Sequence, residues 1–181
     1  MVPAIAMTMW ADERKTGTIE LLLTLPINLR DAILGKYLAA WALIGIALCL
    51  TFPIWITANY LGDPDNGVIF AAYVGSWFMA GAYLAIGACL SACTKNPVIA
   101  FILTVTICVI FVLLGYPFLL GMLTGWVPQI IIDAISSMGF LTHFDSISKG
   151  VFDVRDFLFF GVFIAAWLFA SAVVIELKKA S

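Results

Sequence analysis

Long apolar runs separated by short polar segments dominate the chain. A helix needs about 20 apolar residues to cross the ~30 Å hydrocarbon layer of a membrane, because each residue advances about 1.5 Å. Backbone in hydrocarbon must satisfy its own hydrogen bonds, and these runs do not alternate apolar with polar residues, so helices are expected and not a β-barrel. Four runs are long enough, and the expected spans are residues 37–60, 68–94, 98–121 and 157–176.

The third apolar run continues to Ile132, which is too long for one crossing. We expect it to break at residues 115–117 (Gly-Tyr-Pro) or at Gly121. Residues 122–156 then form an outer loop that re-enters the membrane or lies along its surface. Pro53 lacks an amide proton, so it is expected to bend the first span.

The composition is far more hydrophobic and less charged than that of a soluble protein. Hydrophobic residues make up 64% of the 181 residues, charged residues only 11%, and the mean hydropathy is +1.10; a soluble domain carries about 25% charged residues. The net charge of −2 excludes a basic nucleic-acid footprint. The four cysteines lie inside apolar runs without Cys-x-x-Cys spacing, so neither a disulfide scaffold nor a metal site is indicated. The fold class is an all-α integral membrane protein.

Lysine and arginine set the expected orientation. If the polar segment 12–36 lies inside, seven basic residues fall on the inner side and only Lys149 and Arg155 on the outer side. We therefore place segment 12–36 and the C-terminus in the cytoplasm. The inner basic residues are Arg14, Lys15, Arg30, Lys36, Lys95, Lys178 and Lys179.

Residues 1–11 are apolar but cover only half a bilayer. They have neither the basic start nor the cleavage site of a signal peptide. We interpret them as the end of a truncated span that begins before residue 1. A short interfacial anchor is the alternative.

Segment 12–36 contains a candidate surface helix. Gly17 interrupts helix propensity, and Thr16 or Thr18 can serve as a helix N-cap. At 100° per residue, Thr16, Glu20 and Thr24 share one narrow polar stripe among leucines and isoleucine, which is typical of a helix lying in the membrane interface.

Pro26 ends this helix, because proline disfavours helical geometry in the residue before it. Asn28 can cap a new helix, with Asp31 in a capping-box-like position, and this helix continues into the first span. The pattern is an elbow suited to receive force from a soluble partner. A solvated loop whose charges only set topology is the alternative.

The stretch from Trp10 to Pro26 (WADERKTGTIELLLTLP), followed by Gly35-Lys36, resembles the signature of type-2 ABC exporter permeases. The run Phe144–Gly150 (FDSISKG) is similar to the gliding-motility-associated branch of that family. The resemblance covers essentially the whole chain, with its four complete spans matching the third to sixth of six.

This resemblance implies a subunit of the bacterial inner membrane that pairs with a second permease subunit to form a translocation path. A separate cytoplasmic ATPase supplies the energy, and ATP and magnesium bind there. No cofactor is expected in this chain, and no phosphate-binding loop of the form Gly-x4-Gly-Lys-Ser/Thr occurs in it.

The resemblance also assigns a coupling segment that docks on the ATPase. Of the ten residues listed next, the first two would end the second span, the following six would form and close a coupling helix, and the last two would open the third span. In chain order these residues are Glu13, Arg14, Gly17, Thr18, Glu20, Leu21, Leu22, Pro26, Gly35 and Lys36.

In the resembled family the outer loop forms short re-entrant helices that close the path, so Trp126, Phe140 and Phe144 are candidate gate residues. Interfacial aromatic anchors are the equal alternative. Asp153 is expected to cap the last span, with Asp156 in its first turn, where the helix dipole favours negative charge.

The span interiors carry no ionisable group, which argues against a proton-driven transporter and an intramembrane hydrolase. His143, the single histidine, has no evident partner in the sequence. The hypothesis is therefore a permease subunit of an ATP-driven exporter, in contact with membrane lipid and not itself an enzyme. The alternative is a non-transporting assembly or anchor subunit that recruits a soluble partner.

Overall fold

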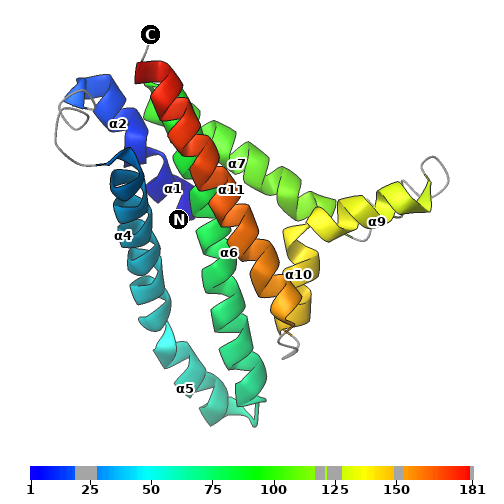
Figure 1. Cartoon of the computed structure of the whole chain (residues 1–181). Helices are drawn as coiled ribbons and strands as arrows, with labels where there is room; N and C mark the ends of the chain where they lie inside the picture. Colours follow the sequence, from blue (N-terminus) through cyan, green and yellow to red (C-terminus); the bar gives the residue numbers. More distant parts are fainter. Residues whose placement is uncertain (19–27, 117–120, 122–127, 149–152, 180–181) are drawn as a thin grey trace.

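The structure is a computed structural model that describes residues 1–18, 28–116, 121, 128–148 and 153–179, without the side chains of residues 134, 135 and 179. Within these ranges the chain forms helices and no strands (Figure 1). The helices are α1 (Val2–Ala6), α2 (Thr8–Thr16), α4 (Leu29–Cys49), α5 (Phe52–Leu61), α6 (Asn66–Cys93), α7 (Pro97–Leu114), α9 (Gln129–Met138), α10 (Phe140–Ser148) and α11 (Val154–Lys179).

Four helical segments are long and apolar enough to cross a membrane: Leu29–Leu61, Asn66–Cys93, Pro97–Leu114 and Val154–Lys178. The chain is therefore an all-α integral membrane protein, as the sequence predicts. Helices α9 and α10 are bent by 66° at the break between them and together also reach the length and hydropathy of a span.

The first span consists of two helices, α4 and α5, with a break at Leu50 and Thr51 (Figure 1). The Thr51 hydroxyl donates to the Leu48 carbonyl at 2.6 Å. Pro53 lies in the first turn of α5, where it removes the amide that would bond to Cys49 in a continuous helix. The expected bend at Pro53 corresponds to this helix break two residues earlier. Helix α4 begins at Leu29, eight residues before the expected span, because Asn28 is its N-cap.

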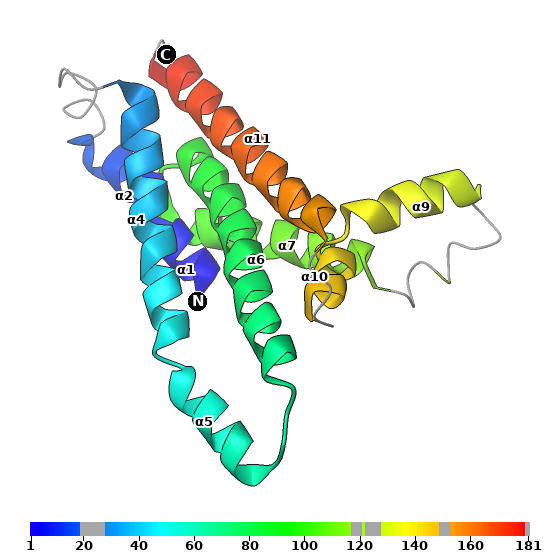
Figure 2. The same ribbon diagram turned by 60° about the horizontal axis from the view of Figure 1, so that its bottom comes forward.

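Helix α6 lies in the middle of the bundle and packs against α1, α2, α4, α7, α10 and α11 (Figure 2). Its small residues let these neighbours approach closely. A Cβ on Gly81 would lie 2.8 Å from Trp41 Nε1, and one on Gly87 would lie 2.3 Å from the Ala6 Cβ. The glycines of α6 therefore set the spacing to α4 and α1.

Two tryptophans close the interface between α4 and α6. The rings of Trp41 and Trp77 stack with centroids 4.4 Å apart. Each indole N–H donates to the backbone carbonyl of the other residue, at 3.0 Å from Trp41 and 3.3 Å from Trp77. The Tyr37 hydroxyl adds a third bond to the Gly81 carbonyl at 3.0 Å. These polar tips are therefore satisfied inside an otherwise apolar interface.

Helix α7 ends at Leu114, and residues 117–120 of the expected span 98–121 lie outside the described residues. Of the two expected break points, the structure breaks the helix at the first, where Gly115 is the C-cap. The physical reason is a backbone crossing, since a Cβ on Gly139 would lie 2.4 Å from the Gly115 Cα. Two glycines thus let the end of α7 contact the junction of α9 and α10.

Phe140, at the start of α10, is wholly buried at that junction. Its ring stacks on Phe111 of α7 with centroids 5.2 Å apart, and it meets Phe163 of α11 edge-on at 4.9 Å. At the start of α11, the Asp153 carboxylate accepts from the Arg155 amide at 2.9 Å, and Asp156 lies in the first turn. The predicted cap of the last span is confirmed.

Candidate functional site

Basic side chains are concentrated at one end of the helix bundle. We call the basic end the region where α2, the start of α4 and the ends of α6 and α11 meet (Figure 1). The opposite end contains the loop from α5 to α6 and the start of α11. Described basic side chains at the basic end are Arg14, Lys15, Arg30, Lys36, Lys95 and Lys178.

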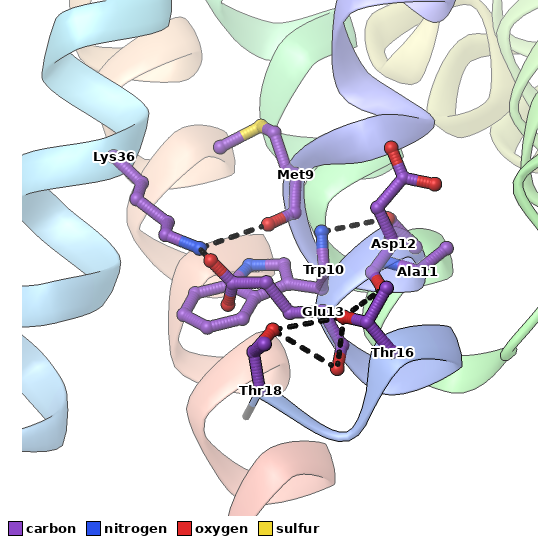
Figure 3. A network of polar contacts seen from close by, with 9 residues as sticks. Met9, Trp10, Ala11, Asp12, Glu13, Thr16, Thr18 and Lys36 are labelled. Atoms are coloured by element: carbon purple, nitrogen blue, oxygen red, sulfur yellow. Dashed lines mark hydrogen bonds and ion pairs between the residues drawn. The ribbon is translucent and has the colours of Figure 1, made fainter. Parts of the chain in front are cut away.

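The end of α2 is built around Gly17. This glycine takes the left-handed conformation with φ 75° as the C-cap of α2, a geometry that favours glycine. The Thr16 hydroxyl donates to the Asp12 carbonyl at 2.9 Å and lies 2.9 Å from the Thr18 hydroxyl (Figure 3). The prediction that Thr16 or Thr18 is an N-cap is wrong for Thr16, the last residue of α2. Both hydroxyls donate instead to carbonyls in the last turns of α2, Thr16 to Asp12 and Thr18 to Glu13.

Glu13 of α2 and Lys36 of α4 form an ion pair across the segment that joins the two helices (Figure 3). The Lys36 ammonium also donates to the Met9 carbonyl at 3.1 Å and lies 4.3 Å from the centre of the Trp10 ring. Both charged side chains are about three-quarters buried. We call this group of contacts the Glu13–Lys36 clamp.

The clamp leaves two buried polar atoms without a hydrogen-bond partner among the described residues. These atoms are Glu13 Oε2 and Trp10 Nε1. A buried polar atom without a partner costs about 1–3 kcal/mol. The clamp is therefore held by a specific ion pair but is not a fully satisfied network.

Ser91 of α6 joins the break between α1 and α2 to the bundle. Its hydroxyl oxygen accepts from the amides of Trp10 at 3.1 Å and Ala11 at 2.9 Å, and it donates to the Met7 carbonyl at 2.9 Å. The Trp10 amide lies in the first turn of α2, where amides have no acceptor within the helix. Ser91 is wholly buried and therefore fixes α2 on α6.

Two basic side chains bind the last carbonyls of α6. Arg14 of α2 donates to the Ala92 carbonyl, and Lys178 of α11 donates to the Cys93 carbonyl. Carbonyls in the last turn of a helix have no helical partner and carry the negative end of the helix dipole, so cations are favoured there. Helices α2 and α11 are thus both tied to the end of α6.

The structure brings together five of the residues assigned to the coupling segment. Glu13, Arg14, Gly17, Thr18 and Lys36 all lie where α2 meets the start of α4 or the end of α6. Gly35 is exposed on α4, with open space where a Cβ would point. Glu20, Leu21, Leu22 and Pro26 lie outside the described residues.

Asn28, the expected N-cap of the following helix, does occupy that position. Its side chain makes no capping bond to the backbone and donates instead to the Asp31 carboxylate at 3.1 Å. The expected capping box is therefore replaced by a side-chain pair.

Among the candidate gate residues, Phe140 lies in the aromatic cluster described above. Phe144 is half-buried, and a Cβ on Gly75 of α6 would lie 3.4 Å from its ring. Both side chains pack within this chain, while Trp126 lies outside the described residues. Their role as a gate stays a prediction.

The sequence gives no partner for His143, but the structure does. Its Nδ1 lies 2.6 Å from Asp156 Oδ1, its Nε2 lies 2.9 Å from the Ser137 carbonyl oxygen, and its ring stacks on Phe159 at 4.1 Å. The contact forms because α10 folds back against the first turn of α11. In the described ranges, no three His, Cys, Asp or Glu side chains are grouped closely enough to hold a metal ion.

Sequence reasoning misses Ser91 and Trp10. Ser91 lies in a run of small residues at the end of α6, where a hydroxyl in an apolar span is a usable signal for a buried hydrogen bond. Trp10 starts the charged motif, and its position over Lys36 follows only from the packing of α2 on α4.

A protein-family model described as "ABC-2 family transporter protein" matches residues 2–144. The matched range includes the whole basic end except the end of α11, together with α9 and most of α10. No curated protein and no solved structure matches the chain.

Proposed function

Because the chain belongs to the ABC-2 family of transporter proteins, we propose that it is the permease subunit of an ATP-driven exporter and that segment 12–36 receives work from a separate ATPase. The observation that carries the coupling part is the set of polar ties at both ends of residues 17–28. Helix α2, before this segment, is bound to α6 through Ser91, and α4, after it, is bound to α2 through the Glu13–Lys36 clamp.

Because of these contacts, a force applied to residues 17–28 is transmitted to the helices on both sides of them. A displacement of residues 17–28 cannot move α2 or α4 alone, because the clamp joins the two helices to each other. Ser91 and Arg14 join α2 to α6, and Lys178 joins α11 to the same end of α6. A displacement of this segment is therefore transmitted to three candidate spans, those that contain α4, α6 and α11.

The proposal places the basic end in the cytoplasm, which puts the C-terminus there as well. The support is the excess of lysine and arginine at that end, which the positive-inside rule assigns to the cytoplasmic side of the bacterial inner membrane. ATP and magnesium then bind to the partner ATPase, and a second permease subunit completes the path. Membership of the gliding-motility-associated branch is a further prediction of the same proposal.

The test is the ATPase activity of the complex between this chain and the ATP-binding subunit that co-purifies with it, reconstituted in liposomes. Glu20→Lys reverses a charge in the coupling segment, and Gly17→Trp places a bulky residue where φ is 75°. Each variant is expected to remove most of the stimulation of ATP turnover by the permease while membrane insertion stays normal. Asp63→Lys, the same kind of charge reversal in the loop from α5 to α6, is the matched control and is expected to retain it.

Unchanged stimulation in both segment variants contradicts the coupling role. The alternative of a non-transporting anchor subunit predicts co-purification as well, so binding alone does not separate the two functions. Substrate-stimulated ATP turnover in liposomes does, because only an exporter couples transport to hydrolysis. Its absence across a panel of lipids, glycolipids, drugs and peptides favours the anchor.

A further inference from the structure

A groove of about 920 Å³ runs between the start of α4 and the end of α11 at the basic end. Its volume is within the range of about 300–1,000 Å³ found for small-molecule sites. Charged and polar side chains surround one part of the groove, and apolar side chains form the rest. The residues that matter are Arg30, Asp31 and Glu176 in the first part and Leu34, Phe169 and Val173 in the second.

The apolar part of the groove belongs to two candidate membrane spans. Phe169 is 69% exposed and Leu34 is 46% exposed, so in a membrane these side chains meet acyl chains. The charged part lies at the ends of the same helices, where a span leaves the hydrocarbon and reaches the headgroup layer. The groove is therefore charged at the end that reaches the headgroup layer and apolar along the rest, as a phospholipid is.

The charges of the groove are open to a ligand. Arg30 and Glu176 are exposed and make no ion pair or hydrogen bond with the part of the chain that the structure describes. Asp31 accepts one bond from Asn28 at 3.1 Å through Oδ2. The groove therefore offers one guanidinium and two carboxylates.

We infer that this groove binds an aminophospholipid of the phosphatidylethanolamine type. A guanidinium binds phosphate through paired N–H donors, and a primary ammonium supplies N–H donors to carboxylates. Phosphatidylcholine carries its cation without an N–H group, and phosphatidylglycerol carries no cation. The combination of one basic and two acidic groups therefore matches the ethanolamine headgroup better than either.

The inference is tested by native mass spectrometry of the purified full chain, exposed to an equal mixture of phosphatidylethanolamine, phosphatidylcholine and phosphatidylglycerol with the same acyl chains. The chain is expected to retain the ethanolamine lipid in preference, by about tenfold, as for the loss of one charge-assisted hydrogen bond. Glu176→Gln is expected to remove this preference, because it removes a carboxylate that meets the ammonium. Arg30→Gln is expected to lower retention of all three lipids, because each of them carries the phosphate. Arg155→Gln, at the exposed start of α11, is the matched control and keeps it.

A second pair of variants tests the place of binding without changing charge. Ala172 lines the groove, so Ala172→Trp fills it and is expected to reduce retention of all three lipids by about tenfold. Ala166→Trp adds the same bulk on an exposed face of α11 outside the groove and is expected to have no effect.

Equal retention of the three lipids by the unaltered chain overturns the inference, and so does retention in Ala172→Trp that matches retention by the unaltered chain. A groove covered by a second copy of the chain would give dimers that exclude lipid, which also overturns it. The measurement uses neither nucleotide nor ATPase, so its outcome is independent of the proposed coupling.

Discussion

At the basic end, hydrogen bonds to backbone atoms and one ion pair between side chains join α2, α4, α6 and α11. At the opposite end, aromatic rings and paired glycines join α7, α10 and α11. Polar ties depend on direction and are lost after a small displacement. Ring contacts tolerate sliding, because dispersion and edge-to-face attraction act over a range of geometries. This difference supports the proposal that a partner switches the arrangement of the basic end.

Removal of the central ring of the aromatic cluster is expected to have the largest effect on stability. Phe140 is wholly buried and contacts rings from α6, α7 and α11. Phe140→Ala is expected to lower the free energy of unfolding by about 3 kcal/mol, mainly through lost packing. Unfolding by a denaturing detergent measures this, and Phe70→Ala, at a residue 54% exposed, is the control. Equal losses in both variants contradict the assignment of Phe140 as the centre of this contact.

Removal of the Ser91 hydroxyl is expected to have the next largest effect, at the basic end. Ser91→Ala leaves the amides of Trp10 and Ala11 and the Met7 carbonyl without their bonds to α6. The expected cost is about 2 kcal/mol. Hydrogen exchange of residues 7–11 should accelerate, with no change in α10. The control is Ser76→Ala, earlier on α6. If hydrogen exchange of residues 7–11 accelerates as much in Ser76→Ala as in Ser91→Ala, the role of Ser91 is contradicted.

Loss of the Glu13–Lys36 clamp is expected to have the smallest effect on the free energy of unfolding. Because Glu13 and Lys36 are partly solvated, their coupling free energy is expected to be about 1 kcal/mol and to fall with added salt. A double-mutant cycle with Glu13→Gln and Lys36→Met measures it. The combination of Thr16→Val and Lys36→Met is the control cycle. A coupling energy indistinguishable from that control shows that the ion pair does not hold α2 on α4.

The apolar runs predict the spans because length and hydropathy decide whether a helix crosses a membrane. Local chemistry also predicts individual boundaries. Pro53 removes an amide and breaks the first span, and Asp153 supplies an acceptor and starts the last. These features depend on neighbours in the sequence alone.

The remaining features depend on contacts between distant residues. The end of α7 is fixed by the backbone of Gly139, which lies 24 residues beyond Gly115. His143 finds Asp156 only because α10 folds back on α11. Ser91 meets the first turn of α2 some 80 residues earlier in the chain. No spacing rule in the sequence predicts such pairs.

The central claim is that work delivered at residues 17–28 reaches the opposite end through the ties to α6. Spin labels at Thr18 and Asp63, in a chain whose four cysteines are replaced by alanine, report the distance between the two ends in the reconstituted complex with the ATPase. The account predicts a nucleotide-dependent change in this distance that is lost when Glu13→Gln is combined with Ser91→Ala. A change that persists in full in that double variant contradicts it.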